Sequence, residues 1–191
     1  MEMSDRPDVA GIDPVFVRFY GEHYPKVLAY CRRRAEPEAA EDASAEVFTA
    51  AWRKWPKVPE GERALPWLYG AAHREILHQW RSAARYRRLV DRMQRLGRTD
   101  PAEPDQVVLD GVEAELAREA LTHLRQSDQE ALRLALWEEL TTPEIADVLG
   151  LTENAVAMRL LRAKRRFGDQ YRALEKRHVK RPLPAASGGG R

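Results

Sequence analysis

Residues 140–167 read LTTPEIADVLGLTENAVAMRLLRAKRRF, a pattern that predicts two short helices joined by a tight turn. Thr142 and Thr152 each stand just ahead of a helical pattern, where a side-chain hydroxyl can accept a hydrogen bond from a free backbone N–H group. Gly150 marks the turn, and Ala146 is small enough to let the two helices cross closely. Together these features indicate a helix-turn-helix.

The second helix of this unit is expected to have a buried and an exposed side. Val156, Leu160, Ala163 and Phe167 recur at helical spacing and form the buried stripe, although Arg159 interrupts the pattern that is usual in repressors. The positions left facing outward are Glu153, Asn154, Ala157, Met158, Leu161 and Arg162.

The same helix carries a run of cations, which a DNA phosphate backbone attracts. The alternative is a helical hairpin in a protein core, with its basic end simply solvated. The helical spacing, the caps, the turn glycine and the positive charge all occur in the same short segment. This combination favours DNA binding. The cations are Arg159, Arg162, Lys164, Arg165 and Arg166.

Charge is sorted along the chain. The formal net charge is only +2 although 32% of the 191 residues are charged, so opposite charges must be grouped separately. Residues 36–46 carry acids without a base, residues 74–98 are rich in arginine, and residues 100–119 are again acidic. Such blocks favour separate contacts with a protein and with a nucleic acid.

The sequence also argues against several functional classes. A single Cys31 excludes an internal disulfide and a cysteine-rich zinc site, and the five-residue spacing of His73 and His78 does not align two ligands, so no metal is expected. Without a phosphate loop or a nucleophile motif, neither catalysis nor a cofactor is expected. No apolar run would cross a bilayer and no signal peptide is recognisable, so the expected location is the cytoplasm, without membrane insertion.

Two helical segments are expected at the start of the chain. Aromatic and aliphatic residues recur at helical spacing in residues 14–34, and Pro25 leaves open whether these residues form two helices or one broken helix. Residues 36–55 form an acid-led helix that is rich in alanine.

One face of the acid-led helix carries carboxylates without a cationic partner at helical spacing. Asp42 and Glu46 lie on this face together with Ala45 and Thr49. The face is either solvated or a docking site for a basic protein surface.

A proline- and glycine-containing loop at residues 56–65 precedes a long helical segment with an apolar band. Cations interleaved with aromatic rings are what single-stranded nucleic acid requires, because phosphates need cations and unstacked bases need flat apolar partners. The alternative is a solvated basic face over a tryptophan-containing core. The basic side carries His73, Arg74, His78, Arg81, Arg85, Arg87 and Arg88.

These patterns predict an all-α fold of two small helical domains, the second ending in the helix-turn-helix. An acidic flexible linker joins the domains, since the segment before Val112 combines prolines, glycines and acids. The expected parts are a flexible leader at 1–13, a first domain at 14–97, the linker at 98–111, a second domain at 112–178 and a disordered tail at 179–191.

The order of these elements resembles a bacterial sigma factor of the small extracytoplasmic-function (ECF) class, which has only regions 2 and 4. AAEDASAEVFTAAW (39–52) is similar to the core-polymerase-binding helix of that class, and ALPWLYGAAHREILHQWRSAARYRR (64–88) to its promoter-melting and minus-ten helix. The stretch at 140–167 is similar to its minus-thirty-five helix-turn-helix. The class usually has glutamine in place of Ala45.

The resemblance implies a role for each matched position. Core polymerase would be bound by Asp42, Ala45, Glu46 and Thr49. The minus-ten element would be bound by Glu60, Gly61, Glu62, Arg63, Trp67, His73, Arg74, Leu77, His78, Arg81 and Arg85. The minus-thirty-five element would be bound by Thr152, Glu153, Asn154, Ala157, Met158, Arg159, Arg162, Arg165 and Arg166.

The resemblance therefore implies a non-catalytic sigma factor that binds core RNA polymerase, recognises both promoter elements and promotes promoter melting. It also implies an anti-sigma factor as a further partner. The alternative is a stand-alone helix-turn-helix regulator whose N-terminal domain senses a ligand or dimerises. Such a regulator would bind a palindromic duplex tightly without polymerase.

Overall fold

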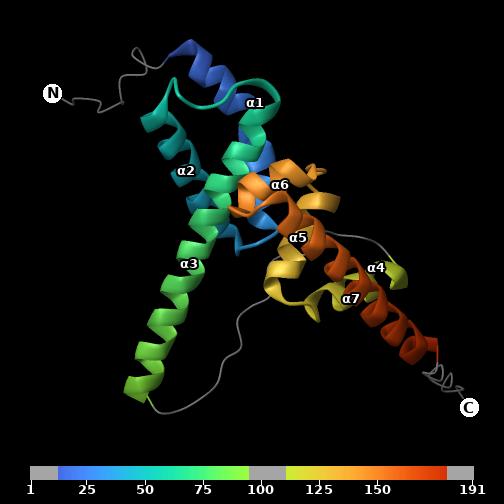
Figure 1. The fold of residues 1–191 in the computed structure, drawn as a ribbon. Coiled ribbons are helices and arrows are strands. Elements are labelled where there is room, and N and C mark those ends of the chain that lie inside the picture. The colour runs from blue at the N-terminus through green and yellow to red at the C-terminus, as the bar shows by residue number, and fades with distance from the viewer. Residues whose placement is uncertain (1–12, 95–110, 180–191) are drawn as a thin grey trace, which may run out of the picture. The chain divides into compact units, whose positions relative to one another are not determined.

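The computed structural model describes residues 13–94 and 111–179, with side chains for residues 13–86 and 111–178. Within these ranges the chain forms seven α-helices, one short 3-10 helix and no strand, which confirms the expected all-α class (Figure 1). The helices form two compact units, one with α1 to α3 and one with α4, α5, α7 and the start of α6. Apart from Asp13, Gly111 and Val179, the expected leader, linker and tail lie outside the described residues.

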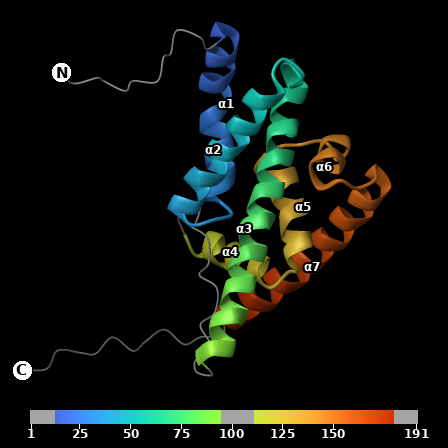
Figure 2. The same ribbon diagram turned by 90° about the vertical axis from the view of Figure 1, so that its left-hand side faces the viewer.

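The first unit is built from three helices and a 3-10 turn. These are α1 (Pro14–Arg32), α2 (Pro37–Lys54), η2 (Gly61–Arg63) and α3 (Ala64–Gln94). Figure 2 shows α2 crossing α1, with α3 alongside α2. The last turns of α3 extend beyond the ends of α1 and α2 (Figures 1 and 2).

Asp13 joins the start of α1 to the end of α2. One oxygen, Oδ1, accepts a hydrogen bond of 2.8 Å from the backbone N–H of Val15 and so caps α1. The other, Oδ2, accepts a hydrogen bond of 2.9 Å from the indole Nε1 of Trp55, the residue that follows α2. A single carboxylate thus fixes how the two helices meet.

An aromatic cluster forms the core between α1 and α2. The ring centroid of Phe16 lies 4.8 Å from that of Trp52 and 5.3 Å from that of Trp55, both edge-on. The expected aromatic stripe is confirmed, and it lies on one continuous helix. Pro25 is inside α1 on its exposed side, so the backbone hydrogen bond that it cannot donate is lost next to water.

His23 lies in the same part of the core and is buried. Its ring meets that of Phe19 edge-on at 4.6 Å. Burial lowers the pKa of His23 below its ordinary value of 6.5, an effect that the nearby carboxylate of Glu22 opposes and the ammonium of Lys26 assists. The imidazole is therefore neutral at pH 7.

Small residues let α2 pack closely against its neighbours. Ala40, Ala43 and Ala51 are fully buried, and the amide of Gln79 on α3 donates a 3.3 Å hydrogen bond to the carbonyl oxygen of Ala39. With this side of α2 buried, its charged residues are left on the opposite side.

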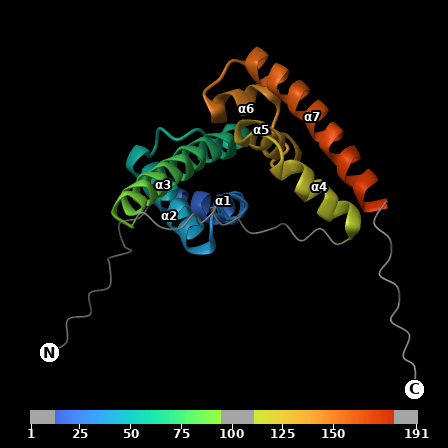
Figure 3. The same cartoon turned by 90° about the horizontal axis from the view of Figure 1, so that it is seen from below.

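The second unit packs two short helices against one long helix. Its elements are α4 (Val112–Thr122), α5 (Gln126–Leu136), α6 (Thr142–Leu149) and α7 (Glu153–Val179). Figure 3 shows α4 and α7 side by side. Leu116 and Ala120 of α4 pack against Leu174 of α7, whereas Leu124 and Leu132 pack against Ala163. The helices before α6 therefore form the scaffold for the helix-turn-helix.

A partly buried ion pair links α5 to α7. The Asp128 side chain is only 8% exposed, and its Oδ2 lies 2.5 Å from Nη1 of Arg166. Next to it, the amide of Gln129 donates a 2.9 Å hydrogen bond to the carbonyl oxygen of Leu124, at the turn between α4 and α5. These polar contacts restrict rotation of α7 on its scaffold.

We expect Arg166→Ala to lower the free energy of unfolding of the second unit by about 1–3 kcal/mol, because it leaves a buried carboxylate without its cation. Amide hydrogen exchange of α5 and α7 measures this loss within the unit. The matched control is Arg165→Ala, which removes an exposed cation that makes no ion pair with any described residue. Equal protection in the two variants would contradict the structural role of the ion pair.

Candidate functional site

The helix-turn-helix begins with a cap at Thr141. The backbone N–H and the hydroxyl of Thr141 both donate hydrogen bonds to Oε2 of Glu144, at 2.7 and 2.6 Å. The first helical hydrogen bond runs from Ile145 N to Thr141 O at 2.9 Å. The expectation that Thr142 is the cap is therefore wrong by one residue. Glu144 stands three residues after Thr141, which is the spacing of a capping box.

The turn and the second cap are confirmed. Gly150 has a φ of +64°, and a Cβ atom there would meet nothing within 4 Å, so the glycine is needed for its backbone conformation. The backbone N–H of Leu151 donates to Ala146 O at 2.9 Å, as in a Schellman motif. The hydroxyl of Thr152 accepts a 3.2 Å hydrogen bond from Ala155 N and caps α7.

The first half of α7 has the two sides that the sequence predicts. Val156 and Ala163 are fully buried, while Leu160 and Phe167 are half-buried against the scaffold. Arg159 is half-buried beside this stripe. The exposed members of the predicted minus-thirty-five set are Thr152, Glu153, Asn154, Ala157, Met158, Arg162, Arg165 and Arg166.

For two residues the structure adds to the prediction for this face. Arg166 is exposed but forms the ion pair with Asp128, which the sequence did not indicate. Leu161 is 63% exposed and was not among the predicted contacts. It follows Asn154 by seven residues and Met158 by three, so all three lie on the same face of the helix. That spacing was the signal that could have identified Leu161.

The predicted acidic face lies on the outward side of α2. Asp42, Ala45 and Glu46 are exposed and Thr49 is half-buried. Neither Asp42 nor Glu46 forms an ion pair with another residue in the part of the chain that the structure describes. Glu41, one position away, instead pairs with Arg32 at 3.0 Å. The carboxylates of Asp42 and Glu46 thus face solvent without an ion-pair partner among the described residues.

Five of the eleven predicted minus-ten residues lie in one row along α3. Because successive residues turn by about 100°, Trp67, Arg74, His78, Arg81 and Arg85 fall on one side of the helix. Trp67 is half-buried and the other four are exposed.

The remaining predicted minus-ten residues lie outside this row. His73 and Leu77 are half-buried beside it, whereas Glu60 and the residues of η2, Gly61–Arg63, are exposed directly ahead of α3. The row and the 3-10 turn are therefore consecutive in the chain.

A shallow cleft of about 250 Å³ separates the acidic face from the row of α3. Its walls come from α2 and α3, and the polar and aromatic residues that line it are Glu46, Lys54, Trp67, Arg74 and Glu75. The ammonium of Lys54 lies 5.7 Å from the centre of the Trp67 ring, within the range of a cation–π contact. The sequence alone did not identify Lys54, because it lies on a different helix from Trp67.

Neither a group of metal ligands nor a membrane-spanning helix is found within the described ranges. No three histidine, cysteine or acidic side chains there are grouped so that they could hold a metal ion. Among the described helices, none combines the length and the apolar character that crossing a membrane requires.

Comparisons with known proteins give two family matches and several relatives. Sigma-70 region 2 matches residues 19–86, and Sigma-70, region 4 matches residues 114–167. The RNA polymerase sigma factor YlaC of Bacillus subtilis is 28% identical over 147 residues, which cover 76% of this chain and 85% of YlaC. The ECF RNA polymerase sigma factor SigL of Mycobacterium tuberculosis is 31% identical over 147 residues, covering 74% of this chain and 80% of SigL.

Solved structures support the same fold. The sigma factor RpoE in complex with the anti-sigma factor NepR from Bartonella quintana aligns with a TM-score of 0.64 at 19% identity, covering 84% of this chain and 98% of that one. CnrH in complex with the cytosolic domain of CnrY aligns with a TM-score of 0.56 at 23% identity, covering 86% and 92%.

Regions 2 and 4 thus match the two helical units, and a relative above 30% identity is matched over most of its length. The chain belongs to the ECF family of RNA polymerase sigma factors, non-enzymatic proteins that recognise promoters for transcription initiation.

Proposed function

We propose that this sigma factor binds its partners through three separate surfaces. The acidic face of α2, formed by Asp42, Ala45, Glu46 and Thr49, binds core RNA polymerase. The row on α3, with η2 ahead of it, binds the minus-ten element, and the outward face of α7 binds the minus-thirty-five element. On this assignment residues 14–97 act as region 2 and residues 112–178 as region 4, with residues 98–111 as the linker.

The observation that carries this proposal is the separation of charge between the surfaces. Asp42 and Glu46 face solvent without a cationic partner among the described residues, whereas exposed cations line α3 and α7. Duplex DNA would be repelled by the first surface and attracted by the other two. A basic protein surface is the complementary partner for the carboxylates, since opposite potentials steer and orient association.

The row on α3 suits a strand that has left the duplex. Arg74, Arg81 and Arg85 offer charge for successive phosphates, and Trp67 with Lys54 offers a ring and a cation beside them. The exposed 3-10 turn at Gly61–Arg63 is the nearest place for one extruded base, whose unstacking costs a few kcal/mol. These features support promoter opening by this unit.

The outward face of α7 suits the major groove. A helix about 10–12 Å wide fits a groove about 12 Å wide, and the polar and apolar groups of Asn154, Met158 and Leu161 can approach base edges there. An apolar side chain such as Leu161 has the thymine methyl group as its partner. Arg162, Arg165 and Arg166 remain in the proposed contact set, and Arg166 also forms the ion pair with Asp128.

Three further roles follow from the family rather than from any one site. The protein performs no catalysis itself, because the polymerase carries out the chemistry. It acts in the cytoplasm, where core polymerase meets the chromosome. An anti-sigma factor is its regulator, a proposal supported by the similar structure of RpoE in complex with the anti-sigma factor NepR.

The proposed function is tested by run-off transcription with core polymerase and a library of promoter fragments. We expect transcripts that depend on both the sigma factor and the promoter sequence. Absence of promoter-dependent transcripts together with absence of core binding would refute the function. Tight binding to a palindromic duplex without polymerase would instead indicate a stand-alone regulator.

We expect Asp42→Arg to weaken binding to core polymerase about tenfold, because it reverses the charge on the acidic face. Co-purification or fluorescence anisotropy with core enzyme measures the change. Glu22→Arg makes the same change of charge on the exposed surface of α1 and serves as the control. If both variants bind core equally well, the acidic face is not the docking surface.

We expect Arg162→Ala to lower affinity for the minus-thirty-five element by about 1–3 kcal/mol and to leave core binding unchanged. Holoenzyme binding to promoter duplexes over a range of salt concentrations measures both the affinity and its salt dependence. Arg177→Ala, which removes an exposed cation from the last turn of α7, is the control. Unchanged affinity and salt dependence in Arg162→Ala would show that the recognition face is misplaced.

A further inference from the structure

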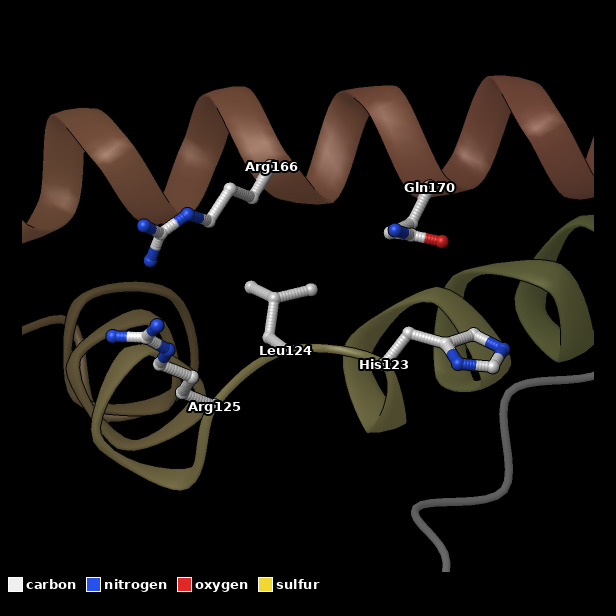
Figure 4. A pocket seen from close by; sticks show the side chains of 5 residues that line it. All are labelled: His123, Leu124, Arg125, Arg166 and Gln170. Carbon is white, nitrogen blue, oxygen red and sulfur yellow. The ribbon is translucent and has the colours of Figure 1, made fainter.

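A second basic site lies in the unit of α4 to α7, apart from the outward face of α7. It is a cleft of about 310 Å³ between the α4–α5 turn and α7, lined by His123, Leu124, Arg125, Arg166 and Gln170. Figure 4 shows the guanidinium groups of Arg125 and Arg166 together at one end of the cleft. The side chains of His123 and Gln170 lie at the other end, with Leu124 between the two groups. We refer to this site as the Arg125 cleft.

The cationic end of the Arg125 cleft has an excess of positive charge. Arg125 is exposed and forms no ion pair with any residue in the described ranges. Arg166 is paired with Asp128, but through Nη1, and a guanidinium offers five N–H donors in all. The two guanidinium groups are therefore accompanied by one carboxylate, which binds only Arg166, and donors of both arginines remain for an oxygen anion.

The same end of the cleft contains the start of α5. Arg125 is the residue before the helix, and no side chain caps the helix there. The first backbone N–H groups of a helix lack partners within the helix and carry a partial positive charge. They add to the positive potential of the two guanidinium groups. Because Arg166 is already held by Asp128, binding an anion requires less ordering than two free arginines would need.

The position of Arg166 relates the cleft to DNA. Arg166 follows Arg162 by one helical turn, so it is rotated by only about 40° from a residue on the outward face. A helix that fills a major groove of about 12 Å has its flanks next to the two phosphate strands. A DNA strand whose phosphates pass Arg162 on this side of α7 would next reach Arg166 and Arg125.

We propose that the Arg125 cleft binds one phosphodiester group of the promoter strand that runs beside α7. The contact carries no sequence information; it fixes the rotation and register of α7 in the groove while the outward face reads the bases. The proposal rests on the proposed function, because α7 must lie in the major groove for the strand to reach the cleft. Its donors are the guanidinium groups of Arg125 and Arg166.

The test uses the full chain as holoenzyme with duplexes that contain the minus-thirty-five element. We expect Arg125→Ala to weaken binding about five- to tenfold and equally for several promoter sequences, and to make the slope of log affinity against log salt shallower by about one. The matched control is Arg177→Ala, which removes one exposed cation from the same unit outside the cleft.

Neutral methylphosphonate groups, placed one at a time along both strands, identify the phosphate. We expect one position at which the neutral group weakens DNA binding by the wild-type protein as much as Arg125→Ala does. At that position the neutral group should have no effect on DNA binding by the Arg125→Ala variant. The cleft proposal is overturned if Arg125→Ala behaves as Arg177→Ala while Arg162→Ala still weakens binding, and the proposed function then stands. If neither the wild-type protein nor any variant binds a promoter in the presence of polymerase, the proposed function is refuted, and the cleft proposal is refuted with it.

Two further outcomes would also overturn the proposal. A loss confined to one promoter sequence would make Arg125 a base-reading residue. Saturable binding of inorganic phosphate or ADP without DNA, abolished by Arg125→Ala while promoter affinity stays unchanged, would make a small phosphate compound the ligand. Isothermal titration with each compound distinguishes these sources from the DNA backbone.

Discussion

The apolar stripe of α7 is the constraint on which the second unit depends. Burying Ala163 and Leu174 against α4 and α5 builds the core of the unit and at the same time determines which residues face away from it. Since each residue turns the helix by about 100°, no residue of the outward face can move without moving the stripe. Core packing therefore orients the outward face that we propose reads DNA, a task that needs a rigid scaffold.

Polar contacts add the precision that apolar packing lacks. An apolar stripe alone tolerates small rotations, whereas the ion pair between Asp128 and Arg166 accepts little change in direction. Asp13 has the corresponding task in the first unit, where it caps α1 and holds Trp55. In both units a buried or half-buried carboxylate fixes one helix on another, and the acids that remain outward are available for a partner.

Three modest surfaces on one chain suit a protein that acts inside a larger enzyme. Each contact by itself involves a few charged side chains at a solvent-exposed face, where single ion pairs contribute little. Binding to polymerase brings the two DNA-binding surfaces to the promoter together, so that one contact raises the effective concentration of the other. Strong binding of an isolated surface is then unnecessary. A sequence-independent phosphate contact, as proposed for the Arg125 cleft, would orient α7 without narrowing promoter choice.

The sequence by itself determined the all-α class, the two-unit division, the helix-turn-helix with Gly150 and Thr152, and the exposed face of α7, because helical period, caps and turn glycines are local properties. It left open whether residues 14–34 form one helix or two, and the structure has the single helix α1 there. It placed the first cap one residue late, since Thr141 and Thr142 differ only in their distance from Glu144. Only the tertiary structure decided that Arg166 pairs with Asp128 and that Lys54 lies beside Trp67. These partners are far apart in the chain or on different helices, and charge alone does not show which arginine meets a buried acid.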